Sequence, residues 1–574
     1  MGVLAAVSEA ATCSTLQNNV DYSGADVGSV PSSSANGCCS ICSTTNGCGA
    51  FTWTNYNRGT CWLKASKGTA KSSTGAISGV LQASSAPSGC QTLEQNVDYS
   101  GADVGSAQSA SANGCCSICS GRSNCGAFTW TNYNGGTCWL KGSKGTGKSN
   151  PGAVSGVVQR STSTSATPTG AVASTDPATA AYPLAAFAIG DWGTTPYKGS
   201  CCSRSNSFSN YDVVAEDVVA SLMNTQAGNQ AVKPKVIMGH GDNFYWTGIN
   251  SAEGRDSQFT QTFEEKFDGA NIKTIPWVNV LGNHDYGGAS YVCNNGNNLA
   301  RCANTAALLQ GIDNKFNWQA TYTSPNDNRW NLKDHFYVHR IEDRATGISI
   351  DIFNIDTNDA DIHGADQICC QCYGYSNGDS ATCRNVGRGH QYCAGGDTGM
   401  FDQCVAKFKA WGDQARSQLA QQVKQSTATW KVVNSHYSAY NHYVEYNMKK
   451  WFDVLRGSGV NLWINGHTHG EKHDYSSSLR MHFAENGAGG GIQKESASGI
   501  PAYAAPYVKN LWTYGSNEYG FMSLQASKNF LKLQYHTADN AWQFGENFQS
   551  TKVGGVATKH CWYIPADGSE GRGC

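Results

Sequence analysis

The chain has 574 residues, a formal net charge of −2 and only 15% charged residues. This length exceeds one ordinary domain and is enough for a sizeable hydrophobic core. The near-neutral charge excludes the basic footprint of a nucleic-acid-binding protein or of a protein that binds anionic membranes. No stretch approaches the ~18 apolar residues that a membrane span needs. We therefore expect neither a nucleic-acid partner nor a membrane span.

The cysteine content is high, with 24 cysteines in clusters. An even number of clustered cysteines indicates a disulfide framework and an oxidising, secreted or extracellular location. The alternative is zinc binding through the Cys-x-x-Cys pairs at Cys39/Cys42 and Cys116/Cys119, but no second Cys/His pair with finger spacing follows. Residues 1–12 are mildly apolar and contain no Lys or Arg. They are either the remnant of a signal peptide or the beginning of a fragment.

The first part of the chain is a tandem repeat of two units, 13–82 and 90–159. Near-identical flanking sequence and a shared cysteine pattern indicate a duplicated domain. Each unit is too small for a sufficient core, so we expect three disulfides in each. Within the first unit we expect a short helix at 35–42 and strands at 50–54 and 60–64. Six cysteines recur at one constant offset: Cys13, Cys38, Cys39, Cys42, Cys48 and Cys61, then Cys90, Cys115, Cys116, Cys119, Cys125 and Cys138.

A linker follows at residues 160–183. Most of it is rich in Ser, Thr, Ala and Pro, and Asp176 is the single charged residue after Arg160. Such a composition cannot bury enough surface to fold, so a flexible tether is expected.

The composition changes at Leu184, where strand-like and helix-like segments begin to alternate. This alternation predicts an α/β domain over 184–574 with a largely parallel sheet, followed by antiparallel strands. We expect a layered β-sandwich flanked by helices. The expected strands are 184–189, 236–238, 275–281, 348–356, 430–434, 460–464, 481–483, 521–526 and 530–536, and the expected helices are 210–224, 405–424 and 446–456.

Two cysteine-rich insertions, 286–331 and 359–404, interrupt this domain. The second contains six cysteines together with His363 and His390. We favour loops held by disulfides over a second metal site. Because long loops in compact domains are usually functional, a role in substrate selection is expected.

Five apolar segments are followed by residues that can bind metal ions. The carboxyl ends of parallel strands converge on one crevice, so these side chains can meet at one point. Glycines before four of the blocks let the backbone turn sharply. The five blocks are Gly190-Asp191-Trp192-Gly193, Gly241-Asp242-Asn243-Phe244-Tyr245, Gly282-Asn283-His284-Asp285, Asn434-Ser435-His436 and Gly466-His467-Thr468-His469.

The donor types in these blocks suit two different metal ions. Carboxylates and a phenolate suit a hard trivalent ion, whereas imidazoles and an amide oxygen suit a divalent first-row ion. One carboxylate can bridge two ions ~3.5–4 Å apart, as in two-metal hydrolases. Each block alone is weak evidence for a metal site. An Asp after a strand is often a helix cap, and a single His is often a polar residue whose hydrogen bonds are made within the protein. All five together predict a metal site.

The repeated units resemble PAN/Apple domains. The resemblance rests on Cys-Cys-x-x-Cys, then Cys-x-Ala-Phe-Thr-Trp, then Gly-Thr-Cys-Trp-Leu-Lys in each unit. It implies small disulfide-bonded α+β modules that bind carbohydrate or protein. Trp53 and Trp62, with their copies Trp130 and Trp139, are candidates for stacking on sugar rings. The alternative is that these aromatic side chains fill a very small core.

The five blocks, in this order, resemble the purple acid phosphatases among the calcineurin-like metallophosphoesterases. Gly-Asp-Asn-Phe-Tyr-Trp-Thr-Gly at 241–248 is similar to the small, mammalian-type tartrate-resistant branch. The resemblance implies a ferric ion and a divalent ion, which is iron, zinc or manganese. By position, Asp191, Tyr245 and His469 would hold the ferric ion, Asn283, His436 and His467 would hold the divalent ion, and Asp242 would bridge the two.

The same resemblance implies the residues that handle the substrate. His284 would bind a phosphate oxygen and protonate the leaving alcohol, next to Asn283, and His442 is a further candidate for substrate contact. The chain departs from the family at Tyr437-Ser438, where a proline usually stands near this point.

The implied function is a secreted acid phosphatase that hydrolyses phosphate monoesters, with PAN modules for attachment. Two alternatives stay open. One is a phosphodiesterase or nucleotidase on the same core. The other is an adhesin-type binding protein in which the phosphatase core is incidental.

Overall fold

The computed structural model describes residues 16–32, 35–45, 48–80, 93–109, 112–120, 122, 125–158, 176–194, 202, 207–287, 292–293, 301–371 and 386–574. The chain forms two compact units, 1–170 and 171–574, and each is described by itself. Cys13 and Cys90 lie outside the described residues.

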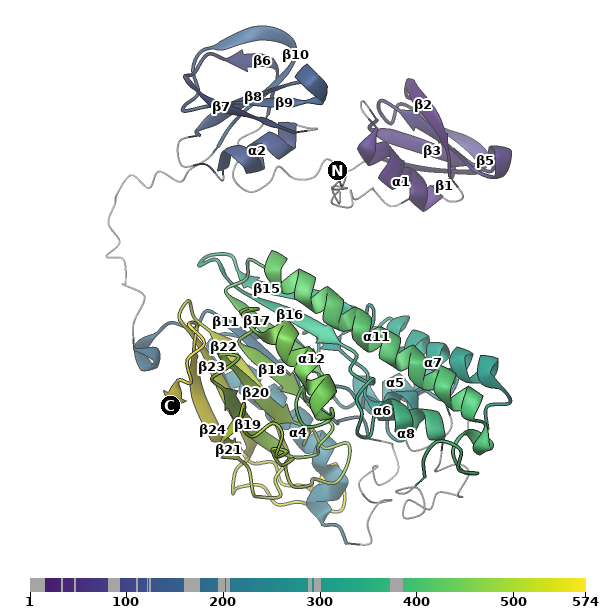
Figure 1. Cartoon of the computed structure of the whole chain (residues 1–574), viewed down its shortest axis with the longest axis vertical. Coiled ribbons are helices and arrows are strands. Elements are labelled where there is room, and N and C mark those ends of the chain that lie inside the picture. The colour runs from purple at the N-terminus through teal and green to yellow at the C-terminus, as the bar shows by residue number, and fades with distance from the viewer. Residues whose placement is uncertain are drawn as a thin grey trace. The chain divides into compact units, whose positions relative to one another are not determined.

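Each repeat in the first unit is a five-stranded antiparallel sheet with one helix packed on it (Figure 1). The strand order is β1-β5-β3-β4-β2 in the first repeat, and β6-β10-β8-β9-β7 in the second. The first repeat contains β1 (Gln17–Tyr22), β2 (Asp26–Pro31), α1 (Ala35–Thr44), β3 (Ala50–Thr54), η1 (Tyr56–Arg58), β4 (Thr60–Lys64) and β5 (Ala70–Val80). The second contains β6 (Glu94–Tyr99), β7 (Asp103–Gln108), α2 (Ala112–Ser120), β8 (Ala127–Thr131), η2 (Tyr133–Gly135), β9 (Thr137–Lys141) and β10 (Gly147–Val157).

Disulfides staple the helix of each repeat to the rest of the repeat. In the first repeat Cys38 bonds Cys61, and Cys42 bonds Cys48. The second repeat has the equivalent bonds Cys115–Cys138 and Cys119–Cys125. Cys39 and Cys116 are also disulfide-bonded, so the zinc alternative for the Cys-x-x-Cys pairs is wrong.

The second unit contains two mixed sheets. In the eight-stranded sheet, β14-β13-β12-β11 are parallel, and β22, β23, β24 and β25 continue the sheet antiparallel. Its strands are β11 (Leu184–Ile189), β12 (Pro234–Gly239), β13 (Trp277–Asn279), β14 (Trp330–Asn331), β22 (Gly520–Ala526), β23 (Phe530–Ala538), β24 (Val556–Pro565) and β25 (Arg572–Gly573).

The seven-stranded sheet has the order β15-β16-β17-β18-β20-β19-β21. The four strands from β16 to β20 in this order are parallel, and β15, β19 and β21 are antiparallel additions. Its strands are β15 (Phe336–Asp343), β16 (Ile348–Ile355), β17 (Trp430–Ser435), β18 (Leu462–Asn465), β19 (Glu471–Ser476), β20 (Met481–Asn486) and β21 (Lys509–Thr513).

The two sheets share one core between them. Ala186 and Met238 of the first sheet belong to the same buried cluster as Ile352 and Val432 of the second. Alternate residues on the same strands, such as Phe187, point to the outer faces instead. Helix α4 (Asn210–Asn229) covers one outer face, and α11 (Thr398–Gln425) and α12 (Glu445–Leu455) cover the other. Figure 1 shows these layers.

The predicted layered sandwich flanked by helices is therefore confirmed, and its parallel strands are divided between two mixed sheets. Strand–helix alternation produced parallel strands in both sheets. Every residue of β11 and β16 is buried, so neither strand has a face exposed to solvent. The sequence therefore could not show which of the two sheets each strand joins.

The two expected insertions contain regular structure. Helix α7 (Thr305–Ala320) lies in the first and buries Leu308 and Ile312 in the main core. The second contains α8 (Ala365–Cys370), η5 (Ala394–Gly396) and the first turns of α11. Disulfides Cys293–Cys302, Cys369–Cys404 and Cys370–Cys393 hold these segments, and Cys561–Cys574 closes the last strands. The remaining short elements are η3 (Pro177–Thr179), α5 (Arg255–Phe259), η4 (Thr260–Glu264), α6 (Asn283–Tyr286) and η6 (Phe548–Ser550).

Among the described residues, no helix is both long and apolar enough to cross a membrane.

Candidate metal centre

All seven predicted metal ligands lie just beyond the carboxyl ends of strands. Asp191 follows β11, and Asp242 and Tyr245 follow β12. Asn283 begins α6 shortly after β13. His436 follows β17, and His467 and His469 follow β18. The strands belong to both sheets, so the site lies where the ends of the two sheets meet.

Three of these side chains form one group around the carboxylate of Asp191. The hydroxyl of Tyr245 lies 3.1 Å from Asp191 Oδ1 and 3.4 Å from His469 Nε2. His469 Nε2 lies 3.7 Å from the same carboxylate oxygen. A carboxylate, a phenol and an imidazole thus face one another, and they are the three groups that the resemblance assigned to the ferric ion.

Three other side chains form a second group around the amide of Asn283. Asn283 Oδ1 lies 3.2 Å from His436 Nε2 and 3.1 Å from His467 Nδ1. The two imidazole nitrogens are 3.3 Å apart. One amide oxygen and two imidazoles suit a divalent first-row ion.

Asp242 lies next to both groups. Its Oδ1 is 3.5 Å from His436 Nε2 and accepts the backbone N–H of His284 at 3.0 Å. Ligand atoms of Asp191, Asp242 and His436 all lie within 4.8 Å of one another. The second carboxylate oxygen of Asp242 is fully buried and has no hydrogen-bond donor among the residues that the structure describes. An orphaned buried oxygen at this position fits a cation, so the residues present fit a two-metal centre.

The electrostatics of the site also fit a bound cation. Burial, and then the charge of Asp242, raise the pKa of Asp191 well above the usual carboxyl range. Burial and the same two carboxylates raise the pKa of Tyr245. Burial lowers the pKa of His436 and His467, so these imidazoles are neutral and can act as ligands. Two buried carboxylates close together favour positive charge nearby, and a bound metal ion would supply it.

The backbone is strained and closely packed at the ligands. Asp191, Asp242 and His467 have φ values of 56°, 51° and 71°, a region that residues other than glycine rarely adopt. A Cβ on Gly282 would lie 2.2 Å from Asp242 Oδ1, and one on Gly466 would lie 2.3 Å from Asp191 Oδ2. Gly282 and Gly466 are therefore required because the carboxylates of Asp242 and Asp191 occupy the space beside them.

Other backbone and side-chain groups hold the predicted ligands and their loops in place. His436 Nδ1 lies 2.7 Å from the carbonyl oxygen of His240, and His469 Nδ1 lies 3.0 Å from Glu495 Oε2. Asp285 accepts the backbone N–H groups of Asn243, Phe244 and Gly282, which ties two of the ligand loops together. The position of Asp285 next to His284 was visible in the sequence, but Glu495 had no motif that could reveal it.

Two predicted substrate residues border the centre. The ring of His284 lies 4.8 Å from that of Tyr245, and its Nδ1 lies 3.0 Å from the carbonyl oxygen of Trp246. His442 is buried, and its ring lies 4.7 Å from that of His467. Within the described part of the chain, Nδ1 of His442 has no hydrogen-bond partner. The structure thus places both imidazoles next to the centre, His284 beside Tyr245 and His442 beside His467.

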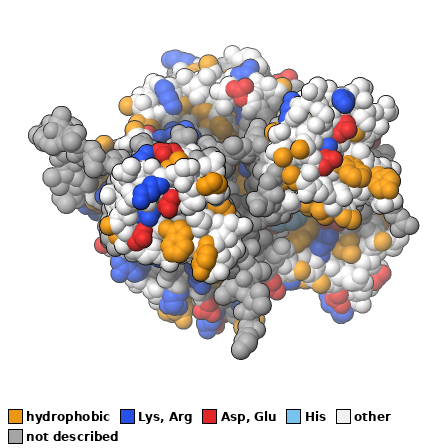
Figure 2. Space-filling model, turned by 90° about the horizontal axis from the view of Figure 1, so that it is seen from above, with side chains coloured by type: hydrophobic (Ala, Val, Ile, Leu, Met, Phe, Trp, Pro, Cys, Tyr) orange, Lys and Arg blue, Asp and Glu red, His pale blue; other side chains and the backbone are white. Residues whose placement is uncertain are grey.

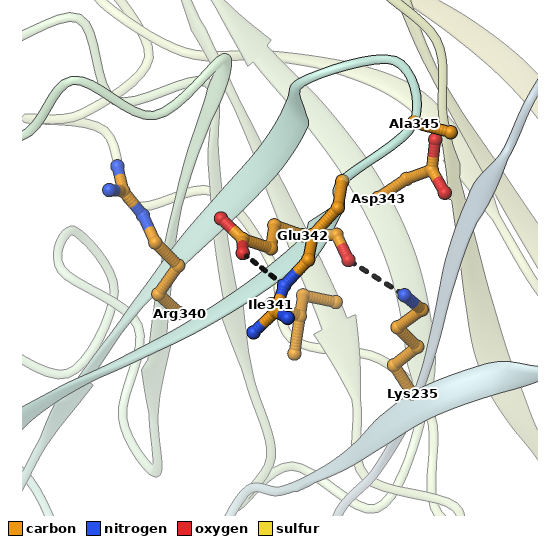
Figure 3. A pocket seen from close by; sticks show the side chains of 7 residues that line it. Lys235, Arg340, Ile341, Glu342, Asp343 and Ala345 are labelled. Atoms are coloured by element: carbon orange, nitrogen blue, oxygen red, sulfur yellow. Dashed lines mark hydrogen bonds and ion pairs between the residues drawn. The ribbon is translucent and has the colours of Figure 1, made fainter. Parts of the chain in front are cut away.

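One pocket lies well away from these residues (Figure 3). It is lined by Lys235, at the start of β12, and by residues 340–345 at the turn between β15 and β16. Lys235 donates to the carbonyl oxygen of Glu342 at 2.7 Å, and Arg344 pairs with the carboxylate of Glu342 at 3.1 Å. Asp242 follows the opposite end of β12, so this pocket is separate from the candidate centre.

The aromatic side chains of the PAN-like repeats have different environments. Trp53 packs against the small core and donates its indole N–H to the carbonyl oxygen of Ser32 at 2.8 Å. Tyr56 is 60% exposed, and its ring lies 5.9 Å from that of Trp62. Figure 2 shows that hydrophobic side chains also reach the surface beside charged ones. The second repeat has the same arrangement at Trp130, Tyr133 and Trp139.

Comparison with known protein families agrees with both parts of the chain. Residues 20–64 and 97–141 match the PAN domain, and residues 187–471 match the calcineurin-like phosphoesterase family.

Two relatives and one solved structure illustrate the similarity. Tartrate-resistant acid phosphatase type 5 of Mus musculus is 31% identical over 180 residues, which are 31% of this chain and 42% of the relative. Purple acid phosphatase 3 of Arabidopsis thaliana is 24% identical over 304 residues, 52% of this chain and 64% of the relative. The structure of purple acid phosphatase PPD1 from Lupinus luteus seeds aligns with 11% identity and a TM-score of 0.33, covering 86% of this chain and 77% of that one.

The chain thus spans less than half the length of the mouse relative. The fold, the five ligand blocks and the family matches agree with one another. Residues 187–471 therefore form a calcineurin-like phosphoesterase domain whose homologues include purple acid phosphatases, and two PAN domains precede it.

Proposed function

We propose that the protein is a metal-dependent acid phosphatase that hydrolyses phosphate monoesters at a centre of one Fe(III) and one divalent ion. The observation that carries this proposal is the pair of ligand groups on either side of Asp242. Asp191, Tyr245 and His469 form the first, and Asn283, His436 and His467 form the second. The divalent ion is iron, zinc or manganese.

The metal ions, when bound, acidify water and neutralise the charge of the phosphate oxygens. The protein contributes the geometry. Asp242 would bridge the ions, because its Oδ1 lies 3.5 Å from His436 Nε2 and its buried Oδ2 has no hydrogen-bond donor among the described residues. The phenol of Tyr245 distinguishes this site from phosphoesterases without iron, since a phenolate bound to Fe(III) absorbs visible light.

The protein also supplies groups that handle the substrate. A carbonyl oxygen only accepts hydrogen bonds, so the contact with Trp246 places the proton of His284 on Nδ1. Nε2 of the neutral ring is then a hydrogen-bond acceptor, and after it takes up a second proton it would donate a hydrogen bond to a phosphate oxygen or give that proton to the leaving alcohol. His442, whose Nδ1 has no partner among the described residues, provides a second imidazole on the His467 side of the centre.

The PAN domains would attach the enzyme to carbohydrate or protein. Trp62 and Trp139, each beside an exposed tyrosine, are better placed to stack on a sugar ring than the packed Trp53 and Trp130. We place the protein in a secreted or extracellular setting, because disulfides form and persist in oxidising environments.

The experiment is a joint measurement of metal content, colour and activity on the purified full-length protein. We expect two metal ions per chain, a visible band, and phosphate release from an aryl phosphate monoester at acid pH. Asp242→Asn should reduce this activity by at least ~100-fold, because it weakens the bridge between the two ions. Asp453→Asn, on the exposed side of α12, is the matched control and should keep wild-type activity.

Two results would redirect the proposal. A faster reaction on an aryl phosphodiester or a nucleotide than on the monoester would favour the phosphodiesterase or nucleotidase alternative. A protein that binds no metal and releases no phosphate, while its PAN domains bind glycans, would favour the adhesin alternative.

A further inference from the structure

The three imidazoles of the candidate centre each have a partner on the ring nitrogen that faces away from the other ligands. His436 is held by the carbonyl oxygen of His240, and His469 is held by Glu495. Such outer partners fix the tautomer and orientation of a metal-binding histidine. His467 belongs to the same pattern, but its partner comes from a different part of the chain.

His467 directs its two ring nitrogens to different neighbours. Nδ1 faces Asn283 Oδ1 at 3.1 Å and His436 Nε2 at 3.3 Å, so it is the nitrogen that points into the ligand group. Nε2 lies 3.4 Å from Nδ1 of His363. With Nδ1 of His467 left free for a metal ion, its Nε2 carries the proton and is placed to donate to His363.

The backbone around His363 is held in place by α12 and the loop before it. The backbone N–H groups of Asp361 and Ile362 both donate to the carbonyl oxygen of His442 at 3.0 Å. The carboxylate of Asp361 accepts from Val444 N at 2.9 Å and from Asn447 Nδ2 at 3.0 Å. Lys409 of α11 adds an ion pair to Asp361 at 2.7 Å.

Tyr437 joins His363 to Asn283, one of the proposed ligands. The hydroxyl of Tyr437 lies 2.7 Å from the carbonyl oxygen of His363 and 3.1 Å from Asn283 Oδ1. The backbone of His363 has φ of 62°, in the same left-handed region as the ligands Asp191, Asp242 and His467. Strained residues of this kind persist only where surrounding contacts hold them, and they cluster at functional sites.

We infer that His363 is a positioning residue of the metal centre that accepts the Nε2 proton of His467 and so aims Nδ1 at the divalent ion. The cysteine-rich insertion is therefore part of the centre, which explains why disulfides Cys369–Cys404 and Cys370–Cys393 hold the segment that follows His363. This inference rests on the proposed function, because it presupposes that His467 binds a divalent ion.

The test measures zinc binding by the full-length protein after its divalent ion has been removed by dialysis. His363→Ala removes the acceptor and should weaken zinc binding ~10–100-fold, the usual effect of losing an outer partner. His363→Asn places an amide oxygen near the position of Nδ1 and tolerates the left-handed backbone, so it should bind zinc much more tightly than the alanine variant. His390→Ala removes an exposed imidazole from the same insertion and is the matched control.

The iron band separates this inference from the proposed function. We expect His363→Ala to keep the visible absorption band of the proposed Tyr245–Fe(III) pair, while its affinity for zinc falls. Zinc binding of His363→Ala equal to that of the wild type would overturn the inference, as would equal weakening in the alanine and asparagine variants. A wild-type protein that binds neither iron nor zinc would instead overturn the proposed function.

Discussion

The hydroxyl of Tyr245 lies 3.1 Å from the carboxylate of Asp191, although the two residues follow different strands. Both side chains are buried, and burial raises the pKa of each. In the protein without metal the phenol keeps its proton and donates a hydrogen bond to the carboxylate of Asp191. A trivalent ion would displace that proton, so this pair is where the proposed iron would change the protonation of the protein.

Tyr245→Phe tests this relationship. Phenylalanine keeps the ring that packs 4.8 Å from His284, but it removes the oxygen that would bind iron. We expect the visible band to disappear and iron to be retained less tightly, with little change in the thermal unfolding temperature of the metal-free protein. Absorption spectroscopy and iron analysis check this. A variant that stays coloured would show that the phenolate is not the chromophore.

Glu495→Gln tests the partner of His469. Glu495 Oε2 lies 3.0 Å from Nδ1 of that histidine, and glutamine keeps a hydrogen-bond acceptor but loses the charge. We expect iron affinity to fall ~10-fold in the glutamine variant and up to ~100-fold in Glu495→Ala. Competition with an iron chelator measures this. Glu445→Gln, in an exposed pair with Lys449 on α12, should change nothing.

Gly282→Ala tests the close approach of the backbone to the bridging carboxylate. The added methyl group would lie 2.2 Å from Asp242 Oδ1, so the carboxylate or the loop must move. We expect loss of metal binding and ~1–3 kcal/mol lower free energy of unfolding, measured by denaturant titration. Gly499→Ala is the control, because a methyl group there meets no atom within 4 Å. Full metal content in Gly282→Ala would contradict the packing argument.

Stability in acid should depend on three buried histidines, which lie on β19, β20 and β24. His473 lies 2.9 Å from His482 and 2.9 Å from His560 through its two ring nitrogens. Burial lowers the pKa of His482 and of His560 to about 4, and it lowers the pKa of His473 well below the usual range. Between pH 6.5 and 4 the unfolded chain therefore binds more protons than the folded protein.

The free energy of unfolding should then fall as the pH decreases through this range, by about 1.4 kcal/mol per pH unit for each histidine that stays neutral in the folded state. This stability is fully present above pH 6.5. His482→Gln should make the pH dependence shallower, as measured by denaturant unfolding from pH 7 to pH 4. An unchanged slope would show that His482 takes up its proton without unfolding.

Much of the centre could be predicted from short motifs. The five blocks each follow an apolar strand, and the spacing within each block is local, so the sequence alone identified the seven ligand-type residues and the residue types that suit two ions. The repeated cysteine pattern likewise predicted the stapled modules, because a core that small needs covalent support.

Contacts between distant segments needed the tertiary structure. The pairing of Tyr245 with Asp191 and of His467 with His363 joins residues 54 and 104 positions apart. Nothing local in the sequence marks Glu495 or His363 as partners of a ligand. The division of the strands into two sheets was also invisible, because fully buried strands have no polar face to show which sheet they join. The sequence determined which chemical groups are available, and the packing of the two sheets decided which of them meet.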